Sequence, residues 1–115
     1  MRITSEIWVK AYLRRCAGAG AAAVLERRGD AERGAIFIRL SRLDGTAALL
    51  APAVAAGKGA DADRRWQMSH AFLPETEVDA VLARQIGYDP DLWIVAVEDR
   101  EGRHFLAEAL IEVGA

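Results

Sequence analysis

The amino-acid sequence predicts an α+β fold, a layered sandwich with a mostly antiparallel sheet of four to six strands and two main helices. Residues 5–17 and 75–86 have the apolar spacing of helices buried on one side. Between and after them, short segments rich in β-branched residues are typical of strands, mostly joined at hairpin spacing. A three-layer α/β/α sandwich is the alternative, because residues 92–97 are apolar on both faces of the predicted strand.

The first helix is expected to begin near Thr4 or Ser5 and to end at Gly18 and Gly20, which have the backbone freedom to stop a helix. A strand over residues 7–13 is the alternative, because apolar residues also alternate there. The glycines favour the helix. Its predicted buried stripe consists of Ile7, Trp8, Ala11, Tyr12, Arg15 and Cys16.

Three strands are expected next, over residues 21–28, 35–40 and 46–50. In the second, Ile36, Ile38 and Leu40 face one way and Phe37 and Arg39 the other. The Asp-Gly pair at residues 44–45 predicts a hairpin turn before the third. Residues 51–63 are small and polar, and their length and composition predict a mobile loop.

Residues 65–72 are expected to form a strand that carries Trp66, Met68 and His70 on one face. Pro74 then opens the second helix, which Gly87 closes. The predicted buried stripe of this helix is Val78, Val81, Leu82 and Ile86. Residues 92–97 form an interior strand, 98–102 a turn, 103–106 a partner strand, and 107–113 a short helix or a tail.

The composition predicts a single globular domain over residues 1–115 in a reducing cytoplasm. The chain contains no apolar run of the ~18 residues that a membrane span needs, and no secretory signal precedes Glu6. The one cysteine, Cys16, cannot form an internal disulfide and is expected to be a buried apolar residue. The net charge of −2 disfavours nucleic-acid binding, which needs a basic face.

No catalytic residue, metal ligand or cofactor site is predicted. The glycines at 18 and 20 follow a helix, whereas the dinucleotide fingerprint follows a strand, so we expect no nucleotide cofactor. The acidic residues on either side of residues 92–97 lie at opposite ends of one strand, too far apart to share a metal. Ser69 and His70 are neighbours in a strand and should face opposite ways.

Arginine is the remaining chemical signal, since only two of the 15 basic residues are lysine. Arginine forms planar bidentate contacts with carboxylates and phosphates that lysine cannot. Solvated surface charge is the simpler interpretation. The candidate anion-binding residues are Arg14, Arg28, Asp30, Arg64 and Arg65.

Four segments carry a resemblance to a known family: IWVKAYLRR at residues 7–15, RRGD at 27–30, GAI at 34–36 and DPDLWI at 89–94. In order and spacing they resemble the bacterial domain-of-unknown-function family 1491. The likeness covers nearly the whole chain except residues 50–66. It implies a small, cytoplasmic, single-domain protein with no assigned activity, and it transfers no catalytic residue.

Two functional hypotheses follow from these observations. The first is a non-catalytic binding or assembly module, either a homodimer formed through an exposed helix or sheet face or a binder of an unidentified protein. The second is an enzyme or sensor that holds a phosphorylated or carboxylated small molecule through its arginines. The position of the arginines in the folded chain, gathered or scattered, discriminates between the two.

Overall fold

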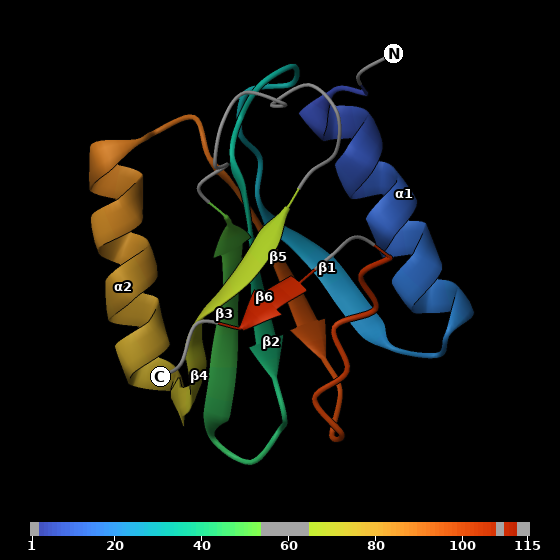
Figure 1. The fold of residues 1–115 in the computed structure, drawn as a ribbon, viewed down its shortest axis with the longest axis vertical. Coiled ribbons are helices and arrows are strands. Elements are labelled where there is room, and N and C mark those ends of the chain that lie inside the picture. The colour runs from blue at the N-terminus through green and yellow to red at the C-terminus, as the bar shows by residue number, and fades with distance from the viewer. Residues whose placement is uncertain (1–2, 54–64, 108–109, 113–115) are drawn as a thin grey trace.

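A six-stranded sheet lies between two helices, one on each of its faces (Figure 1). The structure is a computed structural model that describes residues 3–53, 65–107 and 110–112. The elements in chain order are α1 (Ser5–Gly18), β1 (Ala22–Arg27), β2 (Ile36–Ser41), β3 (Thr46–Pro52), β4 (Trp66–Pro74), α2 (Glu75–Tyr88), β5 (Trp93–Glu98) and β6 (Leu110–Glu112). In the described part of the chain, neither helix has the length and apolar character needed to cross a membrane.

The strands lie in the order β1-β5-β2-β3-β4-β6. The pairs β1/β5, β2/β3 and β3/β4 are antiparallel, while β2/β5 and β4/β6 are parallel. The predicted α+β fold with a mostly antiparallel sheet is therefore confirmed. Of the two predicted layer arrangements, the structure has the three-layer one.

Both faces of the sheet are apolar, which is why each needs a helix. Ile36, Ile38 and Leu40 of β2 join the cluster under α1, and Phe37 joins the cluster under α2. The interior strand β5 divides its side chains in the same way, with Val95 toward α1 and Ile94 toward α2. The alternation predicted for β2 is therefore confirmed.

The buried face of α1 differs from the predicted stripe. Thr4 caps the helix as expected, since its Oγ1 accepts a hydrogen bond from the amide of Ile7 at 3.3 Å. The buried residues are Ser5, Trp8, Val9, Tyr12 and Cys16. Ile7 is 54% exposed, and Ala11 and Arg15 also face solvent. The reason is that Trp8 stacks on Tyr12 and packs at a tilt against Trp66, which turns the helix by about one position.

Two further predictions at element ends are wrong, while the end of the first helix is as predicted. α1 ends at Gly18, and Gly20 adopts φ +84°. The second helix runs to Tyr88, so Gly87 lies inside its last turn. β3 extends through Pro52, so the expected loop over 51–63 starts later. Its residues 54–63 lie outside the described residues.

The segment after the β5 turn does not return as a strand. Residues 103–106 instead cross α1, where the Tyr12 hydroxyl donates to the carbonyl of His104 at 2.6 Å and Arg15 donates to that of Phe105 at 2.9 Å. Tertiary contacts with α1 thus override the local strand preference. Within residues 107–113, the described Leu110–Glu112 form β6 rather than a helix.

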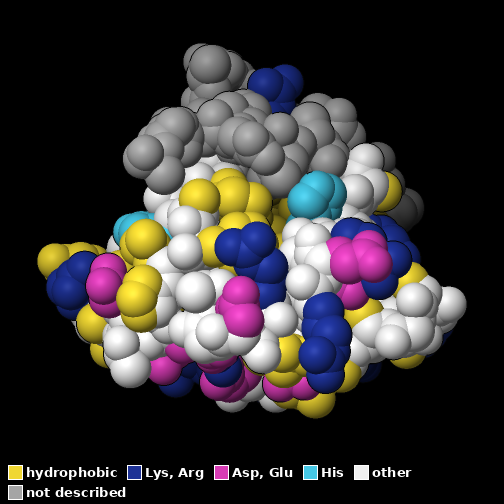
Figure 2. All heavy atoms as spheres, turned by 90° about the horizontal axis from the view of Figure 1, so that it is seen from below, with side chains coloured by type: hydrophobic (Ala, Val, Ile, Leu, Met, Phe, Trp, Pro, Cys, Tyr) yellow, Lys and Arg dark blue, Asp and Glu magenta, His cyan; other side chains and the backbone are white. Residues whose placement is uncertain are grey.

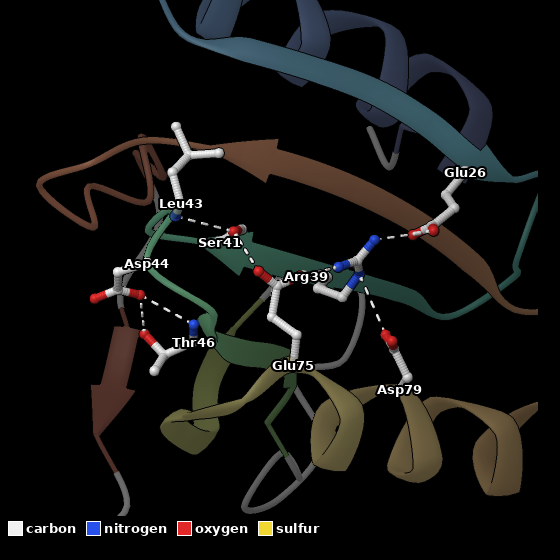
Figure 3. A network of polar contacts seen from close by, with 8 residues as sticks. All are labelled: Glu26, Arg39, Ser41, Leu43, Asp44, Thr46, Glu75 and Asp79. Carbon is white, nitrogen blue, oxygen red and sulfur yellow. Dashed lines mark hydrogen bonds and ion pairs between the residues drawn. The ribbon is translucent and has the colours of Figure 1, made fainter.

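Arg39 ties three elements together on the α2 face of the sheet (Figure 3). It donates to Glu75 of α2 at 2.9 Å and to Glu26 of β1 at 3.0 Å. Asp79 lies 3.7 Å from its Nε. Ser41 donates to the second carboxylate oxygen of Glu75, so the N-terminus of α2 is fixed to β2 at two points.

The connection between β1 and β2 packs directly against the start of β5. The Trp93 indole N–H donates to the carbonyl of Asp30 at 2.7 Å. A Cβ on Gly34 would lie 2.8 Å from the Trp93 ring and would collide with the carbonyl oxygen of Asp91, and a Cβ on Gly29 would collide with the same carbonyl. These two glycines allow the close approach of the connection to β5.

We predict that Gly34→Ala lowers the free energy of unfolding by about 2 to 3 kcal/mol, because backbone or the Trp93 ring must move. Gly18→Ala is the matched control, since nothing lies within 4 Å of the added carbon. It should leave stability unchanged or raise it by up to about 1 kcal/mol. Urea unfolding of both variants measures the difference, and equal stabilities would contradict the packing described.

Candidate functional site

The predicted anion-binding residues on the first half of the chain do not share a pocket. Arg14 is exposed on α1. Arg28 donates to Glu6 at 2.8 Å and lies over the Trp93 ring at 5.1 Å. Glu6 and Arg14 are eight residues apart in the helix, or about 12 Å along its axis. Arg28 therefore acts as a brace between β1 and the start of α1, two turns from Arg14.

Asp30 and Arg65 occupy separate places as well. The Asp30 carboxylate accepts hydrogen bonds from the amides of Glu32 and Arg33, which closes a turn. Arg65 is exposed at the start of β4, four strand positions from β1, or about 19 Å across the sheet. Arg64 lies outside the described residues. An anion site at these positions stays a prediction.

Charge on the surface is correspondingly mixed. Seen from below, basic and acidic side chains alternate among the described residues, with no extended area of one sign (Figure 2). This face therefore has no concentration of like charge that would attract a highly charged ligand.

A pocket of about 360 Å³ lies between α2 and strands β2, β3 and β4. We call it the α2 pocket. Its apolar lining comes from Ala35, Phe37, Leu49, Ala51, Pro52 and Val81. Its polar lining comes from Gln67, Ser69, His70, Gln85 and Asp89. An apolar floor with a few converging polar groups is the usual composition of a small-molecule site.

The polar side of the α2 pocket exists because β4 does not pair regularly with β3. Leu50 pairs with Met68, but Leu49 pairs with His70, so Ser69 is an extra residue in β4. Such a bulge turns two consecutive side chains to one side of the sheet. Ser69 and His70 both line the pocket, and the prediction that they face opposite ways is wrong.

The same bulge corrects the face predicted for this strand. Trp66 and Met68 pack in the cluster under α1, whereas His70 lines the pocket under α2. The expected common face of these three side chains is therefore wrong, because the extra residue shifts the alternation between Met68 and His70.

Ser69 and His70 are in direct contact. The Ser69 Oγ lies 2.9 Å from His70 Nδ1 and 3.3 Å from the carbonyl oxygen of Leu49. A serine hydroxyl has one proton to donate. Either Ser69 donates to the carbonyl and receives the His70 Nδ1 proton, or it donates to His70. In both arrangements, the pair presents fixed hydrogen-bonding groups to the pocket.

The third polar group, Asp89, has a structural use. Its Oδ1 accepts a hydrogen bond from the amide of Asp91 at 3.1 Å, which holds the turn between α2 and β5. A serine nucleophile needs a base whose second nitrogen is oriented by another group. Asp89 is the acidic residue of this pocket, and its carboxylate is engaged in the turn.

Among the described residues, no group of three or more His, Cys, Asp or Glu side chains could hold a metal ion.

Two other reactive groups are accounted for by the fold. Cys16 of α1 is fully buried in the core cluster between this helix and the sheet. Burial raises the pKa of its thiol, so Cys16 acts as an apolar core residue, as predicted. Asp99, buried after β5, accepts two hydrogen bonds from the Arg103 guanidinium, which lowers the pKa of the carboxyl. Asp99 and Arg103 thereby close the turn that follows β5.

A family model described as a protein of unknown function, DUF1491, matches residues 3–107. The chain belongs to the DUF1491 family. The family resemblance read from the four sequence segments is thus confirmed.

Two solved structures agree with this assignment. The chain is 38% identical to a DUF1491 family protein from Caulobacter crescentus CB15, with TM-score 0.80 over 96% of this chain and 98% of that one. It is 35% identical to protein Atu0922 from A. tumefaciens, with TM-score 0.82 over 94% and 95% of the two chains. No curated protein matches the chain.

Membership of the family assigns no activity, so function must be argued from the pocket. The sequence pattern does not predict the α2 pocket, because it places Ser69 and His70 on opposite faces of a strand. The only local signal was the adjacency of the two residues. The bulge that joins them is set by pairing with β3, some 20 residues away in the chain.

We predict that Arg28→Gln raises the pKa of Glu6, because the hydrogen bond from Arg28, and then its charge, hold that pKa below its usual value. A lowered carboxyl pKa stabilises the fold above the usual pKa, and the effect is lost as the pH falls. The stability difference between wild type and variant should therefore shrink as the pH is lowered from about 7 to about 3.

Arg14→Gln is the control for this measurement, since Arg14 is exposed on the same helix. Carbon-detected NMR titration of Glu6 gives the pKa directly. A Glu6 pKa that Arg28→Gln leaves unchanged would show that Arg28 is free of this ion pair.

Proposed function

We propose that the protein is a non-catalytic binding module that takes a small neutral or amine-bearing molecule with an apolar body in the α2 pocket. The supporting observation is the bulge that places Ser69 and His70 together above an apolar floor. The pocket volume of about 360 Å³ is in the range of small-molecule sites.

The lining indicates the chemistry of the ligand. Among the described residues that line the pocket there is no lysine or arginine, and the one formal anion is Asp89. A phosphate or carboxylate buried there would lack the cation that normally balances it. Two glutamine amides, a hydroxyl and an imidazole offer both donors and acceptors, which suit hydroxyl, amide or amine groups.

The contacts within the pocket support recognition rather than turnover. The Ser69 hydroxyl shares its interactions between His70 and the Leu49 carbonyl, and Asp89 closes a turn. Rigid polar groups held by their own hydrogen bonds give orientation and specificity to a bound molecule. The alternative of an anion held by arginines has no observation that favours it, because the described candidates are dispersed.

We predict that small hydroxyl-, amide- and amine-bearing fragments, screened by ¹H–¹⁵N NMR, shift the amide resonances of residues 67–70, 85 and 89. Phosphate- and carboxylate-bearing fragments of similar size should leave these resonances in place. Val81→Phe should abolish the shifts, because its ring would occupy space that Val81 lines. Ser69→Ala should weaken binding about two- to tenfold, the effect of one hydrogen bond.

Ala80→Phe is the matched control, since the same ring is added one residue along α2 at an exposed position. It should bind fragments like the wild type. If anionic fragments alone shift the pocket residues, or if both phenylalanine variants bind equally well, the proposed site is wrong.

A further inference from the structure

The C-terminal end of α2 borders the α2 pocket and carries negative charge. Gln85, in the last turn of the helix, and Asp89, the residue that follows the helix, both line the pocket. The last carbonyl groups of a helix have no donors within the helix, and they hold a partial negative charge. The last turn of α2 contains no basic residue that would balance this charge. A cation in the pocket is therefore favoured at this end.

Asp89 adds a full negative charge at the same place. Its Oδ1 accepts the hydrogen bond from the amide of Asp91 at 3.1 Å, while its Oδ2 has no hydrogen-bond partner among the described residues. No lysine or arginine occurs among the described residues that line the pocket. One carboxylate oxygen is thus left for a donor on a ligand, and a cationic donor gives the stronger hydrogen bond.

The other polar lining groups supply further acceptors. An ammonium group has three donors and no acceptor, and the side-chain carbonyl oxygens of Gln67 and Gln85 can accept from it. His70 accepts as well when its proton is on Nδ1. In that arrangement Nδ1 donates to Ser69, Ser69 donates to the Leu49 carbonyl, and Nε2 has a free lone pair.

A proton on His70 opposes the binding of a cation. The charged ring has donors at both nitrogens, so it loses the acceptor at Nε2 and repels an ammonium ion. Asp89 is the other charged group among the described lining residues, because α2 contributes Val81 and Gln85, and β2 and β3 contribute apolar side chains. Histidine ordinarily changes its charge between about pH 5 and 8, where a primary amine stays protonated.

We propose that the ligand of the α2 pocket is an organic ammonium ion with an apolar body, held through its charge by Asp89 and the C-terminal end of α2, and that protonation of His70 opposes its binding. This assignment rests on the proposed function, and it narrows the ligand from neutral or amine-bearing molecules to amines. The apolar floor, which includes Phe37 and Leu49, takes the body of the ligand.

Two probes with the same apolar body, 2-phenylethylamine and 2-phenylethanol, test the assignment by ¹H–¹⁵N NMR titration of the full chain. At about pH 8, the amine should bind at least about tenfold more tightly than the alcohol. Asp89→Asn keeps an oxygen that can accept from the Asp91 amide but removes the charge, so it should remove most of the amine's advantage. The readout is the ratio of the two affinities, because a distorted pocket would weaken both probes.

Asp91→Asn is the matched control, since it removes the same charge at an exposed position outside the described lining. It should keep the advantage of the amine. Lowering the pH from about 8 to about 5.5 should weaken amine binding at least about threefold, and His70→Gln should remove this pH dependence.

The outcomes separate this assignment from the proposed function. If the alcohol binds as tightly as the amine, if Asp89→Asn keeps the amine's advantage, or if the pH dependence is absent or survives in His70→Gln, the assignment is wrong while the proposed function stands. If neither probe shifts the resonances of residues 67–70, 85 and 89, both are overturned.

Discussion

The width of the sheet relative to α2 is the constraint on which the candidate site depends. A 14-residue helix is about 21 Å long and 10 Å across, so it covers about two strands of a six-stranded sheet. Hollows remain on both sides of α2. The α2 pocket lies toward β4, lined by Val81 and Gln85, and a second groove of about 350 Å³ lies toward β1, lined by Ala83 and Ile86.

The opposite face of the sheet is closed more completely. There α1 is joined by the segment after β5, whose Phe105 and Leu106 pack against the aromatic cluster under the helix. Phe72 fills the same layer with a positive φ of 41°, beneath the Arg42 guanidinium at 3.6 Å. Two register shifts of β4 against β3 thus serve both faces. The shift at Ser69 leaves Ser69 and His70 in the α2 pocket, and the shift between Ala47 and Leu49 returns Phe72 to the α1 layer.

Local patterns predicted the elements whose structure is decided locally. The Asp-Gly turn and the alternation in β2 were predicted because backbone and side-chain preferences agree there. The predicted buried stripe of α1 is wrong at Ile7 and Val9, because the rotation of the helix depends on packing of Trp8 against Trp66 from a distant strand. The pairing of Ser69 with His70 likewise depends on a non-local register with Leu49, which periodicity within β4 cannot encode. The fold was therefore largely predictable, and the candidate site was not.

The position of the His70 ring decides whether the α2 pocket is formed as described, because the bulge must turn that ring toward α2. Nuclear Overhauser effects from the His70 ring protons to side chains can be measured on the unmodified protein. Contacts to the methyl groups of Leu49 and Val81 are expected. Contacts instead to Trp8 or Leu50, in the layer under α1, would show a regular strand and would contradict the bulge.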